Sequence, residues 1–154
     1  MQKIKVFIVS IVVFMVITSA AISAQSTEVV DNLLSSETAG FGDSVYMIAV
    51  GSGLADDDSV SVSEAVVLVN GKGWNVSQKS ADQAISLGEL SFIIMQALDI
   101  EGGIMYSLMP SPRYAVRELK FLDLITEEAH PDKTVSGGDV INILSEAINM
   151  KEAR

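Results

Sequence analysis

The chain has 154 residues, with 20 acidic and 10 basic side chains and a net charge of −10. This acidity argues against nucleic acid as a partner, because phosphate contacts need clustered lysine and arginine, and against adsorption to anionic lipid. The chain contains no cysteine, which excludes disulfides, a thiol nucleophile, thiolate metal sites and a lipidated cysteine.

The first 24 residues predict a secretory signal peptide. Lys3 and Lys5 form a basic start, and an apolar run from Val6 to Ile17 is followed by small residues. This order is typical of an export signal. We therefore expect an exported protein, periplasmic or otherwise associated with the cell envelope.

We expect cleavage after Ala24, with Ala21 as an alternative site. An uncleaved membrane anchor is a further alternative, because Val6–Ala24 spans 19 residues and could just cross a bilayer. Cleavage after Ala24 removes two lysines and no acid, which leaves 8 basic and 20 acidic side chains and a net charge of −12. No other contact with a membrane is expected.

The remaining chain is long enough for one hydrophobic core and therefore for a single domain. Residues 25–42 predict a polar leader or a first short helix, which Ala39–Gly42 would end. The apolar residues of this helix are Val29, Val30, Leu33 and Leu34. Residues 43–154 predict the helical domain itself.

Three helix starts share one pattern, in which an apolar residue and a serine are followed by an acid three positions after the serine. In such a capping box the serine hydroxyl accepts from a backbone N–H of the first turn, and the acid accepts from the N–H of the serine. The acid also favours the positive end of the helix dipole. The pairs are Ser61 with Glu64, Ser86 with Glu89, and Ser136 with Asp139. The apolar runs that follow are 65–69, 90–98 and 140–148.

Amphipathic segments precede the first and third boxes, at 44–54 and 113–125. Both have helical apolar spacing and lead through a loop to the box. The middle unit is irregular: Pro110 and Pro112 interrupt the segment after residues 104–109, and Pro112 suits the first turn of the next helix. The chain thus predicts an all-α, compact helical bundle of about three helix-loop-helix repeats.

This pattern resembles the S-layer homology domain over residues 43–149. The family's usual helix start runs isoleucine, threonine, arginine, alanine, glutamate. The isoleucine place holds Val60, Ile85 and Val135, and the serines and acids of the three boxes hold the threonine and glutamate places. The resemblance implies a three-repeat bundle that binds cell-wall carbohydrate.

The arginine place departs from the family in all three units, since it holds Val62, Leu87 and Gly137. In the family this basic residue is associated with gripping an anionic, pyruvylated wall sugar. None of the three replacements can donate a charge-assisted hydrogen bond to a carboxylate. The resemblance therefore supports the fold more than the family's usual ligand.

No residue pattern identifies catalysis, a metal site or a cofactor. His130 is the only histidine, and its polar surroundings favour a solvated side chain over a catalytic or zinc-binding one. A calcium loop counted from Asp56 would place Val60 at a ligand position and Ser61 where glycine is needed. The plentiful acids leave a paired-carboxylate enzyme open without singling out any two residues.

The candidate binding residues are aromatic or basic: Trp74, Tyr106, Arg113, Tyr114 and Arg117. Helical spacing places Arg113, Arg117 and Lys120 on one face, and aromatic and arginine side chains commonly anchor interfaces. The alternative is structural: Tyr106 and Met109 would lie in the core, the arginines would pair with surplus acids, and Trp74 would be partly buried.

Two hypotheses from different classes follow. The first is an exported, non-enzymatic module that binds a cell-wall glycan or an envelope protein. The second is a structural or assembly partner that acts only through helix–helix contacts between proteins. An enzyme that uses acidic residues ranks a distant third.

Overall fold

The computed structural model describes residues 27–56, 60–74 and 76–153, and in these ranges the extended regular elements are all helices. Apart from two isolated β-bridges, the described residues form helices, turns and loops, so the predicted all-α class is confirmed. The expected signal peptide lies outside the described residues. Within the described ranges, none of the helices is both long enough and apolar enough to cross a membrane.

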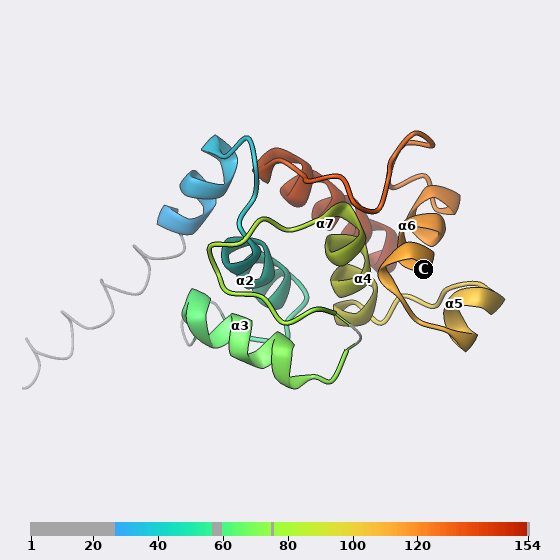
Figure 1. Ribbon diagram of the computed structural model, residues 1–154, viewed down its shortest axis with the longest axis horizontal. Coiled ribbons are helices and arrows are strands. Elements are labelled where there is room, and N and C mark those ends of the chain that lie inside the picture. Colours follow the sequence, from blue (N-terminus) through green and yellow to red (C-terminus); the bar gives the residue numbers. More distant parts are fainter. Residues whose placement is uncertain (1–26, 57–59, 75, 154) are drawn as a thin grey trace, which may run out of the picture.

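Six helices carry labels in Figure 1, and a further helical segment covers residues 27–35. The labelled helices are α2 (Phe41–Gly51), α3 (Val62–Gly71), α4 (Leu87–Ala97), α5 (Ile104–Leu108), α6 (Pro112–Phe121) and α7 (Gly137–Glu152). The amphipathic helices predicted upstream of the first and third boxes correspond to α2 and α6. Pro112 occupies the first turn of α6 as predicted.

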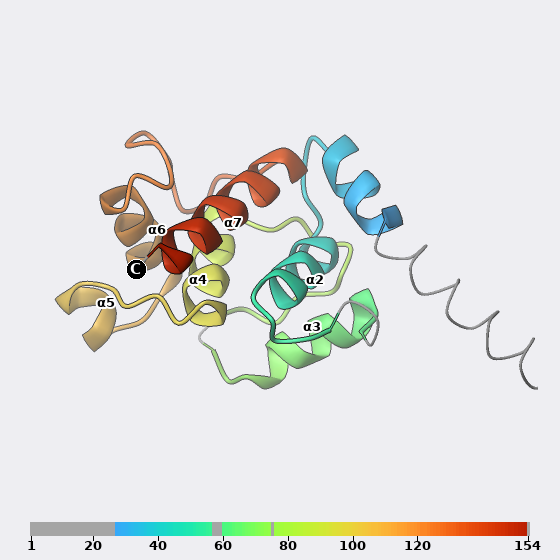
Figure 2. The same cartoon turned by 180° about the vertical axis from the view of Figure 1, so that it is seen from behind.

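Three helices, α2, α4 and α7, contact one another at the centre of the molecule (Figures 1 and 2). The outer helices pack on this centre, α3 against α2 and α6 against α4, and α5 contacts α6. Helices α6 and α7, which the third repeat joins in sequence, do not contact each other.

The hydrophobic core begins earlier than the predicted boundary at residue 43. Val29, Leu33 and Phe41 are buried in the same apolar cluster as the central helices. Of the two alternatives predicted for residues 25–42, the structure agrees with the first short helix, which covers 27–35 and packs on the core, while Leu34 is exposed. Every described residue of the cluster lies between 29 and 150, so a chain of residues 25–154 retains this core.

All three predicted capping boxes are present. Ser61, Ser86 and Ser136 each accept a hydrogen bond from the backbone N–H three residues on, and the acid at that position accepts from the serine N–H. The serine-to-acid spacing therefore identified the starts of α3, α4 and α7 correctly.

The three central helices nevertheless form a different set from the three predicted boxes. The start of α2 follows the pattern of α4 and α7 with glycine in the serine place. The three runs are Ala39-Gly40-Phe41-Gly42-Asp43, Ile85-Ser86-Leu87-Gly88-Glu89 and Val135-Ser136-Gly137-Gly138-Asp139. Residues 39–42 hence begin α2 instead of ending the preceding helix, and the box of Ser61 starts the outer helix α3.

Backbone hydrogen bonds join the three central starts into a closed ring. The start of α2 donates to the loop before α4, the start of α4 donates to the loop before α7, and the start of α7 donates to the segment before α2. These bonds run from Phe41 to Gln83 (2.7 Å), Gly42 to Ala81 (2.8 Å), Leu87 to Lys133 (2.8 Å), Gly88 to Pro131 (2.8 Å) and Gly137 to Ser36 (3.0 Å). The first N–H groups of each helix, which have no partner within the helix, thus hydrogen-bond to a neighbouring repeat.

Candidate binding groove beside helix α6

Helix α6 has two faces of opposite character. Ala115, Val116 and Leu119 are buried, and this face packs against α4. Arg113 and Arg117 are exposed on the other side. Pro112 supplies the fixed backbone angle that suits a first helical turn, and its missing N–H costs nothing there.

The polar side of α6 forms one wall of a cavity of about 590 Å³, which we call the basic groove. The loop before α7 forms the other wall. The polar and proline residues that line the groove are Arg113, Arg117, Lys120, His130, Pro131 and Asp132. The predicted common face of Arg113, Arg117 and Lys120 is therefore confirmed as a geometric arrangement.

Neither arginine of the groove forms an ion pair or a hydrogen bond with any residue that the structure describes. The alternative that the arginines pair with surplus acids is therefore not supported within the described ranges. Lys120 instead donates to the carbonyl of Glu127, and the His130 ring lies 3.7 Å from a carboxylate oxygen of Asp132. Two guanidinium groups thus remain available to an outside acceptor.

A second cavity, of about 520 Å³, adjoins the basic groove and opens over the start of α4. The two cavities share Arg113, Pro131 and Asp132, and the second adds Ser86 and Glu89 of the capping box. Arg113 consequently lies where the two spaces meet.

The acid of this capping box, Glu89, already has a charge partner and hydrogen-bond donors within the protein. Lys79 donates to the Glu89 carboxylate at 2.7 Å, and the Ser86 N–H donates to the same oxygen at 2.9 Å. Burial by itself raises the pKa of Glu89, but the hydrogen bonds from Lys79 and Ser86 outweigh it, so the pKa lies below its ordinary value. Glu89 is therefore ionised and already paired with Lys79, and it does not pair with Arg113, which lines the same cavity.

The three residues at the position where the S-layer homology family has arginine lie in different surroundings. Leu87 is buried, and Val62 is half-buried against the core. At Gly137 a side chain is impossible, because a Cβ atom would lie 1.5 Å from the carbonyl oxygen of Leu33. The backbone of the first helical segment therefore closes the third start, whereas the second start opens to a cavity that Arg113 borders.

The aromatic residues predicted for binding lie elsewhere. Trp74 and Tyr114 are partly buried and pack against the core, as the structural alternative expected for Trp74. Tyr106 is buried too, whereas Met109 is exposed, so the alternative was right for Tyr106 and wrong for Met109. The structure hence brings together only Arg113 and Arg117 of the five candidates.

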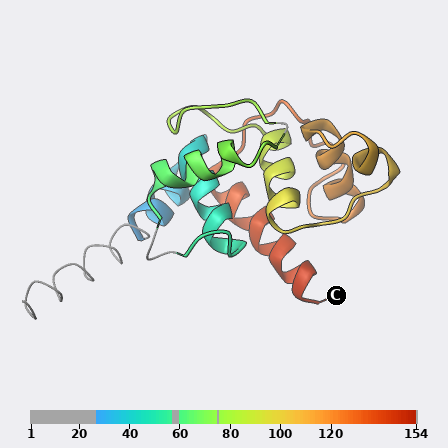
Figure 3. The same ribbon diagram turned by 90° about the horizontal axis from the view of Figure 1, so that it is seen from below.

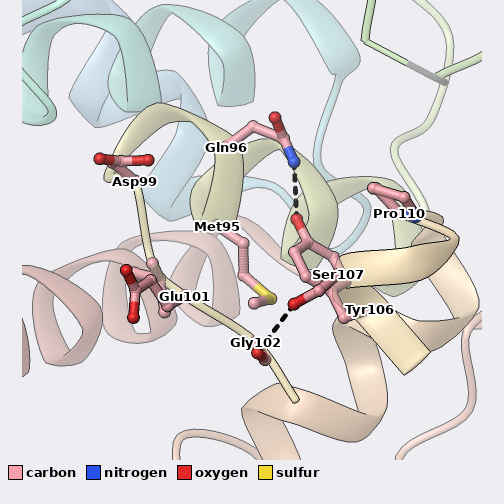
Figure 4. Close-up of a pocket in the computed structure, with 9 residues that line it drawn as sticks. Met95, Gln96, Asp99, Glu101, Gly102, Tyr106, Ser107 and Pro110 are labelled. Atoms are coloured by element: carbon pink, nitrogen blue, oxygen red, sulfur yellow. Dashed lines mark hydrogen bonds between the residues drawn. The ribbon is translucent and has the colours of Figure 1, made fainter. Parts of the chain in front are cut away.

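Tyr106 belongs to a smaller cavity of about 290 Å³ between α4 and α5, shown in Figure 4. Its hydroxyl accepts from the Gln96 amide at 2.8 Å, and its ring meets Phe92 edge-on. Burial raises the pKa of Tyr106. In Figure 4 the carboxylates of Asp99 and Glu101 point away from this hydroxyl. Tyr106 thus anchors α5 to α4 and does not face a reacting group.

The loop residues of the groove, His130 to Asp132, were not selected as binding residues from the sequence. Only a repeat-level signal could have found them: Pro131-Asp132 precedes Ser136 as Ala81-Asp82 precedes Ser86. In the part of the chain that the structure describes, no group of three or more acidic or histidine side chains is placed to hold a metal ion.

Comparison with known proteins gives no match. No protein-family model, curated protein or solved structure matches the chain. The S-layer homology resemblance therefore stays a prediction, and the candidate site depends on its own geometry.

Proposed function

We propose that the chain is an exported, non-enzymatic module of the cell envelope that binds an anionic wall glycan in the basic groove. The observation that carries this proposal is the pair Arg113 and Arg117. Both side chains are exposed in one groove and unpaired among the described residues, although the chain has twice as many acids as bases. Guanidinium groups hold carboxylates and phosphates by paired, charge-assisted hydrogen bonds.

The position of Arg113 supports a link with the second capping box. The family resemblance implies a basic residue at the place of Leu87, and that side chain is buried. Arg113 supplies a guanidinium from α6 to the cavity over the same helix start. A glycan with repeated acidic groups could place one at Arg113 and the next at Arg117, because Arg113 lines both cavities and Arg117 lines the first.

The test is co-sedimentation of purified residues 25–154 with isolated cell-wall sacculi stripped of protein. Wild-type protein is expected to pellet with the walls. Arg113→Gln with Arg117→Gln should weaken binding on the order of tenfold or more, since each charge-assisted hydrogen bond contributes about 1.5–3 kcal/mol. Helical circular dichroism should stay unchanged, because both side chains are exposed.

The matched control is Lys72→Gln with Lys151→Gln. It removes the same charge from exposed lysines outside the basic groove. Equal loss of binding in both double variants would show a general charge effect and reject the groove. No binding of wild type to bare walls, with capture of a defined envelope protein instead, would favour the second candidate, an assembly partner. The exposed apolar residues of α5 are the observation that favours this second candidate.

A further inference from the structure

The exposed apolar side chains of this protein gather at one end. Of the seven large hydrophobic residues that are exposed in the described ranges, four belong to α5 and its C-cap and a fifth is Phe121 at the end of α6. The four, which we call the α5 tip, are Ile104, Met105, Leu108 and Met109. Such concentration is unusual for a surface on which single apolar residues are normally scattered.

The fold holds the α5 tip outward. Tyr106 is the one buried residue of α5, and its contacts with Gln96 and Phe92 fix the inner side of the helix. Helical spacing of about 100° per residue places Ile104 and Leu108 on the opposite side and Met105 on the flank. The short helix stands at the end of the molecule far from α3 and from residues 27–35, as Figures 1 and 3 show.

The charge around the tip differs from that of the rest of the chain. Residues 102–112 contain no charged side chain. The flanking acids Asp99, Glu101 and Glu118 are balanced by Arg113, Arg117 and Lys120, so residues 99–122 are neutral. The whole excess of negative charge lies elsewhere. An anionic surface therefore repels this end of the molecule least. The net charge alone had argued against any adsorption to anionic lipid.

We propose that the α5 tip inserts into the interfacial region of a phospholipid bilayer, with Arg113 and Arg117 at the level of the lipid phosphates. Fluid lipid accepts apolar side chains that point in several directions, and the absence of charge over residues 102–112 suits such a contact. Apolar side chains flanked by arginine are the composition that interfacial membrane contacts use. The tip carries this inference, which goes beyond the proposed glycan site and does not depend on it.

The test is flotation of residues 25–154 with vesicles of phosphatidylcholine, alone and with one-fifth phosphatidylglycerol. Residues 1–24 are left out because their apolar run would bind lipid by itself. Wild-type protein should float with both vesicles, and added salt should not release it from phosphatidylglycerol, because the apolar tip carries the contact. Ile104→Ser with Leu108→Ser should reduce the floating fraction at least tenfold. The matched control is Val67→Ser, which replaces an equally exposed residue of α3 (71% exposed, as is Leu108) and should change nothing.

Each other outcome overturns the proposal. Absence of wild-type flotation rejects lipid, and so does flotation that the tip variant keeps or that Val67→Ser loses equally. A wild-type dimer in sedimentation that Ile104→Ser with Leu108→Ser converts to monomer would show that a second copy covers the tip. Since bare sacculi contain no lipid, the tip variant should still bind them if the glycan proposal holds, so the two proposals fail separately.

Discussion

The starts of α4 and α7 share one sequence pattern and one capping geometry, but their surroundings are opposite. The start of α4 lies beneath an open cavity, and its acid, Glu89, is buried and paired with Lys79. The start of α7 lies beneath the backbone of Leu33, and its acid, Asp139, is exposed. The capping box therefore determines where a helix begins, while the segment that crosses over it determines how much open space lies above the start.

The largest expected effect tests the closed start. Gly137→Ala should destabilise the fold by about 3 kcal/mol or more, because its Cβ would overlap the Leu33 carbonyl and the crossing segment would have to move. Denaturant unfolding followed by circular dichroism measures the loss. A change of less than about 1 kcal/mol would mean that residues 27–36 are not fixed against α7, and the contrast with α4 would disappear.

The next effect compares the two acids. Glu89→Gln should cost about 2 kcal/mol, because it leaves the half-buried Lys79 ammonium without its partner. Asp139→Asn should cost only about 0.5–1 kcal/mol, since it removes a cap interaction at an exposed site. Unfolding of both variants under one condition gives the difference. Equal losses would show that Lys79 adds nothing to the cap.

The lowered pKa of Glu89 predicts that the stability of the fold depends on pH. The pKa of Glu89 is lowered in the fold, so its contribution to stability is complete above its ordinary value of 4.5 and is lost as the pH falls below that value. Asp43 occupies the equivalent place in α2, but Gly40 offers it no hydroxyl, and burial raises its pKa. The stability gap between wild type and Glu89→Gln should therefore narrow below about pH 4.5. A gap that stays constant down to pH 3 would contradict the lowered pKa.

The sequence predicted what depends on near neighbours. The capping boxes and the basic face of α6 could be foreseen, because a serine, an acid three positions on and a spacing of three or four residues act within one helix. The ring of central helices was missed at α2, since Gly40 lacks the hydroxyl by which the other starts were recognised.

Contacts between distant segments could not be foreseen in the same way. That His130 and Arg117 line one groove depends on how the loop before α7 is held against the start of α4. In α5 nearly every side chain is apolar, so periodicity could not decide between Tyr106 and Met109 for the core. Tyr106 is the buried one because its hydroxyl accepts a hydrogen bond from the Gln96 amide, for which a thioether would be only a weak acceptor.

The smallest effect tests the glycine that the two starts share. At Gly138 a Cβ atom would meet nothing closer than the Ser136 hydroxyl at 3.8 Å, so Gly138→Ala should stabilise the protein by about 0.5 kcal/mol through reduced chain entropy. At Gly88 the Cβ would lie 3.1 Å from the Pro131 carbonyl oxygen and 3.2 Å from the Pro112 Cβ. Gly88→Ala should lose that gain, and because it presses on a wall of both cavities it should also weaken binding to sacculi. Thermal unfolding and co-sedimentation of the two variants separate these effects. If Gly88→Ala proved as stabilising as Gly138→Ala, the loop before α7 would move away from the added methyl group at little cost. The groove would then not have a fixed shape in the absence of its ligand.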